Sequence, residues 1–475
     1  MTKFYSSLNE IKRELQSGSI TVEGLVKNYL AQTRLYKHLN AFNEVFEQEA
    51  LSRSKEVDAR IKAKTAGRLA GMVIAIKDNI CYKGHKVTAS SKILDGFTSI
   101  YSSTIVERLL AEDAIIIGRC NCDEFAMGAS NENSYYGPVR NYADDTRVPG
   151  GSSGGSAVAV QANMCHAAIG TDTGGSVRQP ASFCGLVGLK PTYGRISRHG
   201  IIAYASSFDQ VGPVTRSIED AALLMEVMSG ADEYDSTVSR SAVPEYSSNL
   251  SPSKGKKKIA YLQEALSSPG VDDEVKGRLV SYIDKLRAEG HTVKPISFEY
   301  LDYIVPAYYI LAMAEASSNL ARYDGVHYGY RSRAAKDLVT TYKRSRSEGF
   351  GKEVKRRIML GTFVLSAGYY DAYYAKAQKV RRLIKEKTDS LLEEYDFILT
   401  PTAPEPAFTL GRTEKDPVVM YLYDIFTVQA SLAGVPAISL PAGTTNKGLP
   451  LGLQLLTKRF AEQELLDFSK YFLEL

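Results

Sequence analysis

Residues 1–65 repeat apolar positions with the period of an amphipathic helix. A first helix is predicted to begin at a capping box formed by Ser7 and Glu10 and to end at Gly18. A second helix is predicted from Thr21, and a third helix is predicted along a further apolar stripe. That stripe runs through Val45, Ala50 and Val57. We expect these helices to supply packing and no chemistry.

Short continuous apolar runs begin after Gly71 and are typical of strands that are buried on both faces. The runs are "MVIAI" at 72–76, "AIIIG" at 114–118 and "FILTP" at 397–401. The segment "SAVAVQANMCHAAIG" at 156–170 is rich in small residues and predicts a helix that packs tightly onto a sheet. Strands that alternate with helices predict an α/β fold.

The residue composition changes along the chain, but we expect a single domain over 1–475. Residues 1–65 form its helical start, and residues 66–229 hold the strands and the glycine-serine motifs. Residues 230–395 are rich in charged residues and tyrosine and predict a helical excursion. Residues 396–475 return to strand and turn patterns, so we expect the C-terminus to rejoin the first core.

The composition is that of a globular protein, because 44% of the 475 residues are hydrophobic and 24% are charged. Lysine and arginine number 58 against 54 acidic residues, and a net charge of +4 excludes a strongly basic surface for nucleic acid. The N-terminus lacks the apolar core of a signal peptide. No uncharged apolar run approaches the roughly 18 residues of a membrane span. We expect no export and no membrane association.

Five cysteines are spread thinly along the chain and suit a reducing cytoplasm better than a disulfide framework. Cys120 and Cys122 stand too close together for a zinc knuckle, and no further pair of ligands follows at the required spacing. We expect both to be small core residues, and we expect no metal site.

The glycine-serine stretch "GGSSGGS" at 150–156 has the composition of a flexible linker, yet it runs directly into an apolar segment. Gly150, Ser152 and Gly154 also satisfy the G-x-S-x-G pattern of a nucleophile elbow. A phosphate-binding turn is disfavoured, because no Lys-Ser or Lys-Thr pair follows.

A second cluster, "GTDTGGSVRQPA" at 170–181, makes Ser176 the better candidate nucleophile. Glycines before a serine let successive backbone N–H groups turn toward one point, as an oxyanion hole requires. None of the six histidines lies in a motif-like setting, so a Ser-His-Asp relay has no evident base. Lys77 follows the apolar run at 72–76, and burial would keep its amine neutral. The alternative is a glycine-rich turn in which Ser176 only caps the next segment.

Three motifs in this order resemble the amidase signature family: "AIKDN" with Lys77, "PGGSSGGSA" with Ser152 and "GTDTGGSVRQPA" with Ser176. The resemblance covers nearly the whole chain and implies an α/β fold with a large mixed sheet covered by helices on both faces. It implies Ser176 as the nucleophile, Ser152 as a bridging serine after a cis peptide bond, and Lys77 as the base. The implied oxyanion hole consists of the backbone N–H groups of Thr173, Gly174, Gly175 and Ser176.

Further segments, such as "DIFTVQASLAGVPAISLPAG", closely resemble one branch of this family, the A-type glutaminase subunits of glutamyl-tRNA(Gln) amidotransferases. That resemblance implies a heterotrimer with B and C subunits, in which ammonia from glutamine converts Glu-tRNA(Gln) to Gln-tRNA(Gln). It implies no cofactor in this chain and places ATP, Mg²⁺ and the misacylated tRNA mainly at the B subunit. By the same resemblance, Arg357 binds the carboxylate of glutamine, Asp424 binds its ammonium group, and Tyr308 lines the pocket. Ala129 stands near that pocket where the branch often has serine.

Two other functions stay open on the sequence. A free-standing amidase that acts on another small amide uses the same triad but has no need of Arg357 and Asp424. An inactive scaffold that only holds a partner is disfavoured by the intact Lys77, Ser152 and Ser176.

Overall fold

The computed structural model describes residues 3–253, 255–412 and 420–475. In these residues eleven strands form one sheet in the order β1-β3-β2-β4-β6-β5-β10-β11-β9-β7-β8. The strands are β1 (Phe42–Val45), β2 (Val73–Lys77), β3 (Ile115–Cys120), β4 (Ala167–Asp172), β5 (Val187–Lys190), β6 (Gln210–Thr215), β7 (Lys258–Leu262), β8 (Thr292–Ile296), β9 (Phe397–Pro401), β10 (Ala437–Thr444) and β11 (Pro450–Leu456). Parallel pairs join β2 to β3 and β4 and join β7 to β8 and β9, and the other pairs are antiparallel. The sheet is therefore mixed, as predicted.

Helices cover both faces of this sheet. As a result, every residue of β2 to β6 is buried. The α-helices are α1 (Leu8–Gln16), α2 (Val22–Leu35), α3 (Glu47–Ala63), α4 (Thr104–Ala111), α5 (Gly154–Gln161), α6 (Arg178–Cys184), α7 (Ile218–Met228), α8 (Glu264–Ser267), α9 (Asp273–Ala288), α10 (Leu301–Asn319), α11 (Leu338–Gly349), α12 (Lys352–Val364), α13 (Lys376–Glu394), α15 (Val428–Ala433) and α16 (Glu462–Glu474). The short turns are η1 (Lys37–Leu39), η2 (Lys92–Leu94), η3 (Glu124–Ala126), η4 (Leu320–Arg322), η5 (Tyr370–Ala375) and η6 (Leu422–Asp424). Across the described ranges, no helix has both the length and the apolar character needed to cross a membrane.

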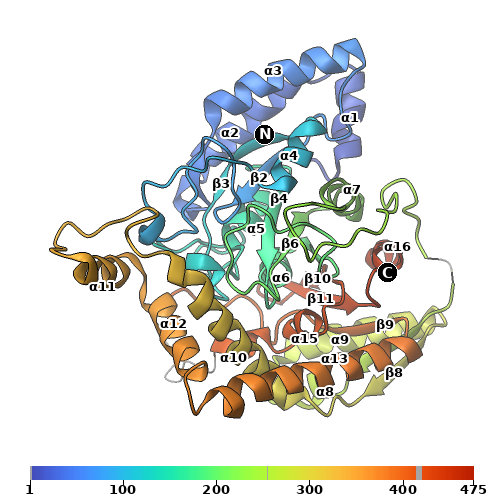
Figure 1. Ribbon diagram of the computed structural model, residues 1–475. Coiled ribbons are helices and arrows are strands. Elements are labelled where there is room, and N and C mark those ends of the chain that lie inside the picture. The colour runs from blue at the N-terminus through green and yellow to red at the C-terminus, as the bar shows by residue number, and fades with distance from the viewer. Residues whose placement is uncertain (1–2, 254, 413–419) are drawn as a thin grey trace.

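The N-terminal helices α1, α2 and α3 lie together at the top of Figure 1, and two details of their prediction are wrong. Ser7 precedes α1, but its side chain makes no capping hydrogen bond, and Glu10 accepts from the N–H and the hydroxyl of Ser6 and not from Ser7. Val45 ends the edge strand β1, so the third helix begins only at Glu47. The start of α2 after Thr21 is confirmed, and the Thr21 side chain accepts the Gly24 N–H.

The small-residue segment at 156–170 is only partly helical. α5 ends at Gln161, and Asn163, with φ of +55°, redirects the chain in the left-handed region. The rest of the segment enters β4, which pairs with β2 and β6 in the middle of the sheet. Its alanines and glycine allow α5 to pack closely on β4 and β2.

Residues 230–395 are mainly helical but also contribute two strands. α10 packs on both α12 and α13, and the three helices lie in the lower part of Figure 1. β7 and β8 of the same segment pair beside β9 and extend the sheet at its edge, so this segment is not wholly a helical excursion. The predicted strand at 397–401 is β9.

The topology brings the two glycine-serine clusters and Lys77 to one edge of the sheet. Because β2 and β4 are parallel, Lys77 at the end of β2 lies at the same edge as the turn that follows β4. α5 begins at Gly154, directly after Ser152 and Ser153, and approaches backbone closely at Gly155. A Cβ at Gly155 would lie 2.6 Å from the carbonyl oxygen of Ala41, so only glycine fits there.

Candidate active site

Lys77 is completely buried and contacts the middle serine of the predicted triad. Its Nζ lies 2.7 Å from Ser152 Oγ and donates hydrogen bonds to Ser153 Oγ and to Thr171 Oγ1, both at 3.0 Å. Ser152 follows a cis peptide bond from Gly151, as the family resemblance implied. The β2 strand end thus holds Lys77 directly against the first glycine-serine cluster.

The neighbours of the Lys77 amine fit its neutral form. Ser153 Oγ donates to the Thr171 carbonyl at 3.2 Å, so its oxygen is left to accept from Lys77. Thr171 Oγ1 accepts from Lys77 and from Asn79 Nδ2 at 3.0 Å. A neutral amine has two N–H groups, which these two oxygens accept, and one lone pair, which is left for the hydroxyl proton of Ser152.

Burial lowers the pKa of Lys77 from its ordinary value to about 8, because the charged amine loses its hydration. Nearby acidic groups, of which Cys122 and Asp123 act most strongly, raise this pKa again but do not cancel the effect of burial. A buried lysine with this pKa is partly neutral near neutral pH and can accept a proton.

Ser176 lies in the turn between β4 and α6 and is 8% exposed. Its carbonyl oxygen accepts the Ser153 N–H at 3.1 Å, which joins the two glycine-serine clusters. A Cβ at Gly170 would lie 2.7 Å from Ser153 Oγ, so the clusters also pack closely. Side-chain hydrogen bonds therefore connect Lys77 to Ser152, whereas the backbone connects Ser176 to the same loop.

The turn before Ser176 holds backbone donors that are available to a ligand. Within residues 3–253, 255–412 and 420–475, no acceptor pairs with the N–H groups of Gly174, Gly175 or Ser176. Gly175 has φ of +142°, in the region that favours glycine. The Thr173 side chain is fixed by a hydrogen bond, in which its Oγ1 donates to Asp209 Oδ1 at 2.8 Å. Free N–H groups on one tight turn can stabilise an oxyanion.

Tyr308 and Tyr309 on α10 connect this turn to Asp424. A Cβ at Gly174 would lie 2.7 Å from the Tyr308 hydroxyl, so Tyr308 packs directly against the turn. The rings of Tyr308 and Tyr309 meet edge to face with centroids 5.0 Å apart. The Tyr309 hydroxyl donates to Asp424 Oδ2 at 2.7 Å. Burial raises the pKa of the Asp424 carboxyl to about 7, although this hydrogen bond and Arg357 act to lower it.

Arg357 on α12 is 4% exposed and is held by three neighbours. Its Nε donates to Glu353 Oε1 at 2.7 Å, and its Nη1 donates to the Tyr204 hydroxyl at 2.8 Å. The guanidinium also lies 5.3 Å from the centre of the Tyr309 ring. A buried guanidinium that its neighbours hold in one orientation is suited to binding a carboxylate.

A cavity of about 380 Å³ opens beside these groups. Arg357, Tyr309 and Ala129 are among the residues that line it. Lys77, Ser152, Ser176 and Asp424 do not line it and are buried. The structure therefore brings Arg357 and Tyr309 to the cavity wall. Tyr309 contacts Asp424, and Tyr308 contacts the turn of Ser176, so these side chains connect the wall to that turn.

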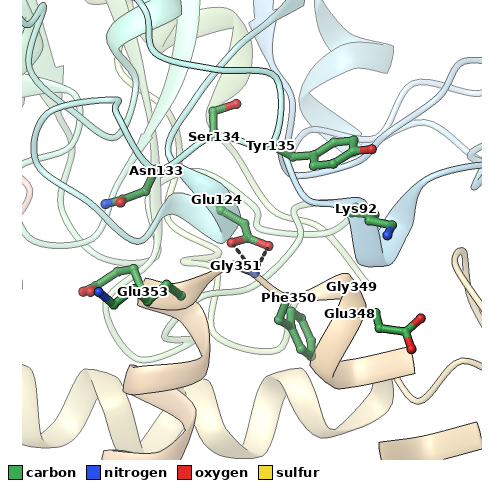
Figure 2. A pocket seen from close by; sticks show the side chains of 11 residues that line it. Lys92, Glu124, Asn133, Ser134, Tyr135, Glu348, Gly349, Phe350, Gly351 and Glu353 are labelled. Atoms are coloured by element: carbon green, nitrogen blue, oxygen red, sulfur yellow. Dashed lines mark hydrogen bonds between the residues drawn. The ribbon is translucent and has the colours of Figure 1, made fainter. Parts of the chain in front are cut away.

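A second cavity, of about 420 Å³, shares Asn133 and Glu353 with the first. Figure 2 shows Glu124 at its centre, with its carboxylate turned toward the backbone of Gly351. None of the predicted site residues lines this second cavity.

Four residues that contribute to the site were not predicted from the sequence. Ser153 and Thr171 bind Lys77, Thr427 binds the Gly174 carbonyl, and Tyr309 binds Asp424. The only available signals were weak: Ser153 and Thr171 lie inside the two motifs, Tyr309 stands beside Tyr308, and Thr427 stands one helical turn after Asp424.

Cys120 and Cys122 are completely buried in the core, where burial raises the pKa of the Cys122 thiol to about 12. Among the residues with described positions, no group of three or more His, Cys, Asp or Glu side chains could hold a metal ion.

A family model and several known proteins match this chain over most of its length. The family model described as Amidase matches residues 24–466. The A-type glutamyl-tRNA(Gln) amidotransferase subunit of Chlorobium phaeobacteroides (strain DSM 266) is 52% identical over 471 residues, which cover 98% of each chain. The crystal structure of the A-type glutamyl-tRNA(Gln) amidotransferase subunit from Thermotoga maritima superposes with a TM-score of 0.77 at 41% identity, covering 95% of this chain and 91% of that one.

A more distant neighbour is the peptide amidase from Stenotrophomonas maltophilia, with a TM-score of 0.82 at 28% identity over 98% of this chain and 95% of that chain. The fold expected from the sequence is therefore confirmed, and the family model and the relatives extend over nearly the whole chain. The chain belongs to the amidase family.

Proposed function

We propose that this chain is the glutaminase subunit of a tRNA-dependent amidotransferase, which releases ammonia from glutamine for the conversion of Glu-tRNA(Gln) to Gln-tRNA(Gln). The observation that carries the proposal is the placement of a cation and an anion beside one serine hydrolase site. Arg357 lines the cavity, and Asp424 is linked through Thr427 to the turn of Ser176. Free glutamine presents a carboxylate and an ammonium group, and the two side chains match these two charges.

Proton transfer in this proposal begins at Lys77. Its neutral amine takes the hydroxyl proton of Ser152, Ser152 takes the hydroxyl proton of Ser176, and Ser176 Oγ forms a bond to the amide carbon of glutamine. The proton on Lys77 then returns through Ser152 to the leaving nitrogen, the C–N bond breaks, and ammonia departs. Water hydrolyses the glutamyl ester on Ser176 and yields glutamate.

The oxyanion of the tetrahedral intermediate is assigned to the backbone donors of the turn at Thr173, Gly174, Gly175 and Ser176. Support comes from the N–H groups of the last three, which have no acceptor within the described residues. Each such donor typically stabilises the transition state by about 3 kcal/mol.

The assembly is part of the same proposal. We assign B and C subunits as partners, with ATP, Mg²⁺ and the misacylated tRNA held mainly by the B subunit, and we place the reaction in the cytoplasm. The relatives named as A-type subunits support a complex of several subunits.

The test is ammonia release from glutamine, measured for the chain alone and for the chain with B and C subunits and charged tRNA. We expect the partners and tRNA to stimulate the release. Partner-independent turnover of unrelated amides, with no response to tRNA, would favour the alternative of a free-standing amidase.

A further inference from the structure

Asp123 and Glu124 are adjacent residues whose buried carboxylates serve two different parts of the site. Asp123 is completely buried and Glu124 is 4% exposed. We propose that this pair is a bridge of two positioning residues, in which Asp123 holds the loop of Ser152 and Glu124 holds the helix of Arg357. The inference rests on the proposed function, because it assigns separate roles in chemistry and in glutamine binding.

Asp123 contacts the loop of the bridging serine through its backbone and its side chain. Its N–H donates to the Ser152 carbonyl oxygen at 3.2 Å. Its carboxylate packs so closely on Gly151 that a Cβ at that residue would overlap with Oδ2. The same carboxylate accepts the Asn131 N–H at 2.9 Å and the Asn133 N–H at 3.1 Å. Asp123 therefore joins the peptide that carries Ser152 to the loop of Asn131 and Asn133.

Glu124 faces the other way and binds the start of α12. Its Oε1 and Oε2 accept the Gly351 N–H at 3.1 and 2.9 Å, as the dashed lines in Figure 2 show. Ser91 Oγ donates to Oε1 of the same carboxylate. Gly351 precedes the first residue of α12, so the Glu124 carboxyl group supplies an acceptor for one of the N–H groups that the start of a helix leaves unpaired.

The residue after Glu124 makes a second contact with the same end of α12. The ring of Phe125 meets the ring of Phe350 edge to face, with centroids 5.7 Å apart. Phe125 has φ of +51°, and the η3 turn around it is buried. Two independent contacts therefore join one short turn to the N-terminus of α12.

α12 carries Glu353 and Arg357, so the position of its first turn sets the position of the proposed carboxylate-binding group. Arg357 lies within two helical turns of Gly351. Loss of the Glu124 contact should release the helix start and weaken glutamine binding. Loss of the Asp123 contacts should disturb Ser152 and slow the chemistry.

The experiment compares Glu124→Ala and Asp123→Asn in the chain assembled with its B and C subunits. We expect Glu124→Ala to raise the KM for glutamine about tenfold with kcat within about twofold, since a hydrogen bond to a charged group contributes about this factor. We expect Asp123→Asn to lower kcat about tenfold or more with KM within about twofold, because the asparagine amide cannot accept both backbone N–H groups. Glu124→Gln, which keeps an acceptor oxygen for Gly351, should recover most of the affinity.

Binding is measured separately by titration of glutamine into the same variants in a Ser176→Ala background. Only Glu124→Ala should raise the Kd for glutamine. Matched controls are Glu107→Ala and Asp145→Asn, two exposed carboxylates away from the site, and both should leave kcat, KM and Tm unchanged.

The proposal of two separate positioning roles is contradicted if both variants change the same kinetic parameter. It is also contradicted if they lower Tm while kcat and KM stay at wild-type values. The proposed function fails in a different way, since the wild-type assembly would then release no ammonia from glutamine.

Discussion

Thr427 Oγ1 donates a hydrogen bond to the carbonyl oxygen of Gly174 at 2.5 Å. The peptide between Gly174 and Gly175 is trans, so its C=O and N–H point in opposite directions. A carbonyl held by Thr427 therefore aims the Gly175 N–H to the opposite side, where no acceptor in the described ranges pairs with it. The Thr427 backbone N–H donates to the Asp424 carbonyl oxygen at 3.0 Å, which links the proposed ammonium-binding residue to the same turn.

Thr427→Val should lower kcat for glutamine hydrolysis about 10- to 100-fold and leave KM nearly unchanged. The reason is that a backbone donor out of line with the oxyanion weakens an interaction that is made mainly in the transition state. Thr427→Ser keeps the hydroxyl and should retain most of the activity. Steady-state ammonia release checks both variants. A Thr427→Val enzyme with normal kcat would show that the turn orients itself without this hydrogen bond.

The rate of glutamine hydrolysis should rise with pH between about 7 and 9. Burial lowers the pKa of Lys77 to about 8, and only the neutral amine can take the proton of Ser152. Protonation below this pKa removes the base, so kcat should fall as the pH drops through about 8. The measurement is a profile of kcat against pH, and a flat acidic limb would contradict the role of Lys77.

Glutamine affinity should depend on pH through Asp424. Its pKa is raised to about 7 by burial, and the ionised form, which binds an ammonium group, prevails above that value. The KM should therefore fall as the pH rises through about 7. Tyr309→Phe removes a hydrogen bond that lowers this pKa, so the variant should need a higher pH to reach its lowest KM. Tyr303→Phe, at an exposed position of the same helix, is the control and should leave the profile unchanged.

Ser176→Ala should abolish amidation with glutamine but preserve amidation with added ammonia. The variant lacks the oxygen that forms the acyl bond, whereas ammonia supplied from solution bypasses that step. Product formation on charged tRNA, with each nitrogen source in turn, checks the prediction. Equal loss with both sources would mean that Ser176 is needed for the structure.

Gly155→Ala should lower the free energy of unfolding by about 1–3 kcal/mol, because the added methyl group overlaps with backbone that cannot move away. Gly277 on α9 is the matched control, since a Cβ there meets no atom within 4 Å. Gly277→Ala should raise stability by about 0.5–1 kcal/mol, through lower backbone entropy in the unfolded chain. Denaturant unfolding of both variants gives the comparison, and equal effects would contradict the close packing of α5.

The predictions from sequence succeeded where a pattern is local. The buried strands at 72–76 and 397–401 have continuous apolar runs, and β2 and β9 lie there. β8 was missed because Lys294 and Pro295 interrupt its apolar residues, and its place at the sheet edge leaves most of its side chains exposed or half-buried. β7 was missed because its apolar run is short and directly follows a series of lysines. Their pairing depends on contacts with β9 that no local pattern contains.

The candidate site shows the same limit. The motifs indicated Lys77, Ser152 and Ser176 because each lies beside glycines or at a strand end, and the roles of these residues stay predictions. Tyr309 and Thr427 could not be chosen from the sequence, since their importance comes from hydrogen bonds to residues more than a hundred positions away. Choosing between Tyr308 and Tyr309 requires the direction in which each side chain leaves α10.

The groups proposed for chemistry and those proposed for recognition come from different stretches of the chain. Lys77, Ser152 and Ser176 precede α6, whereas the arginine and the tyrosines lie on α12 and α10. Substrate preference can therefore diverge by substitutions within residues 301–364 and at η6, which holds Asp424, while the hydrolytic groups stay unchanged.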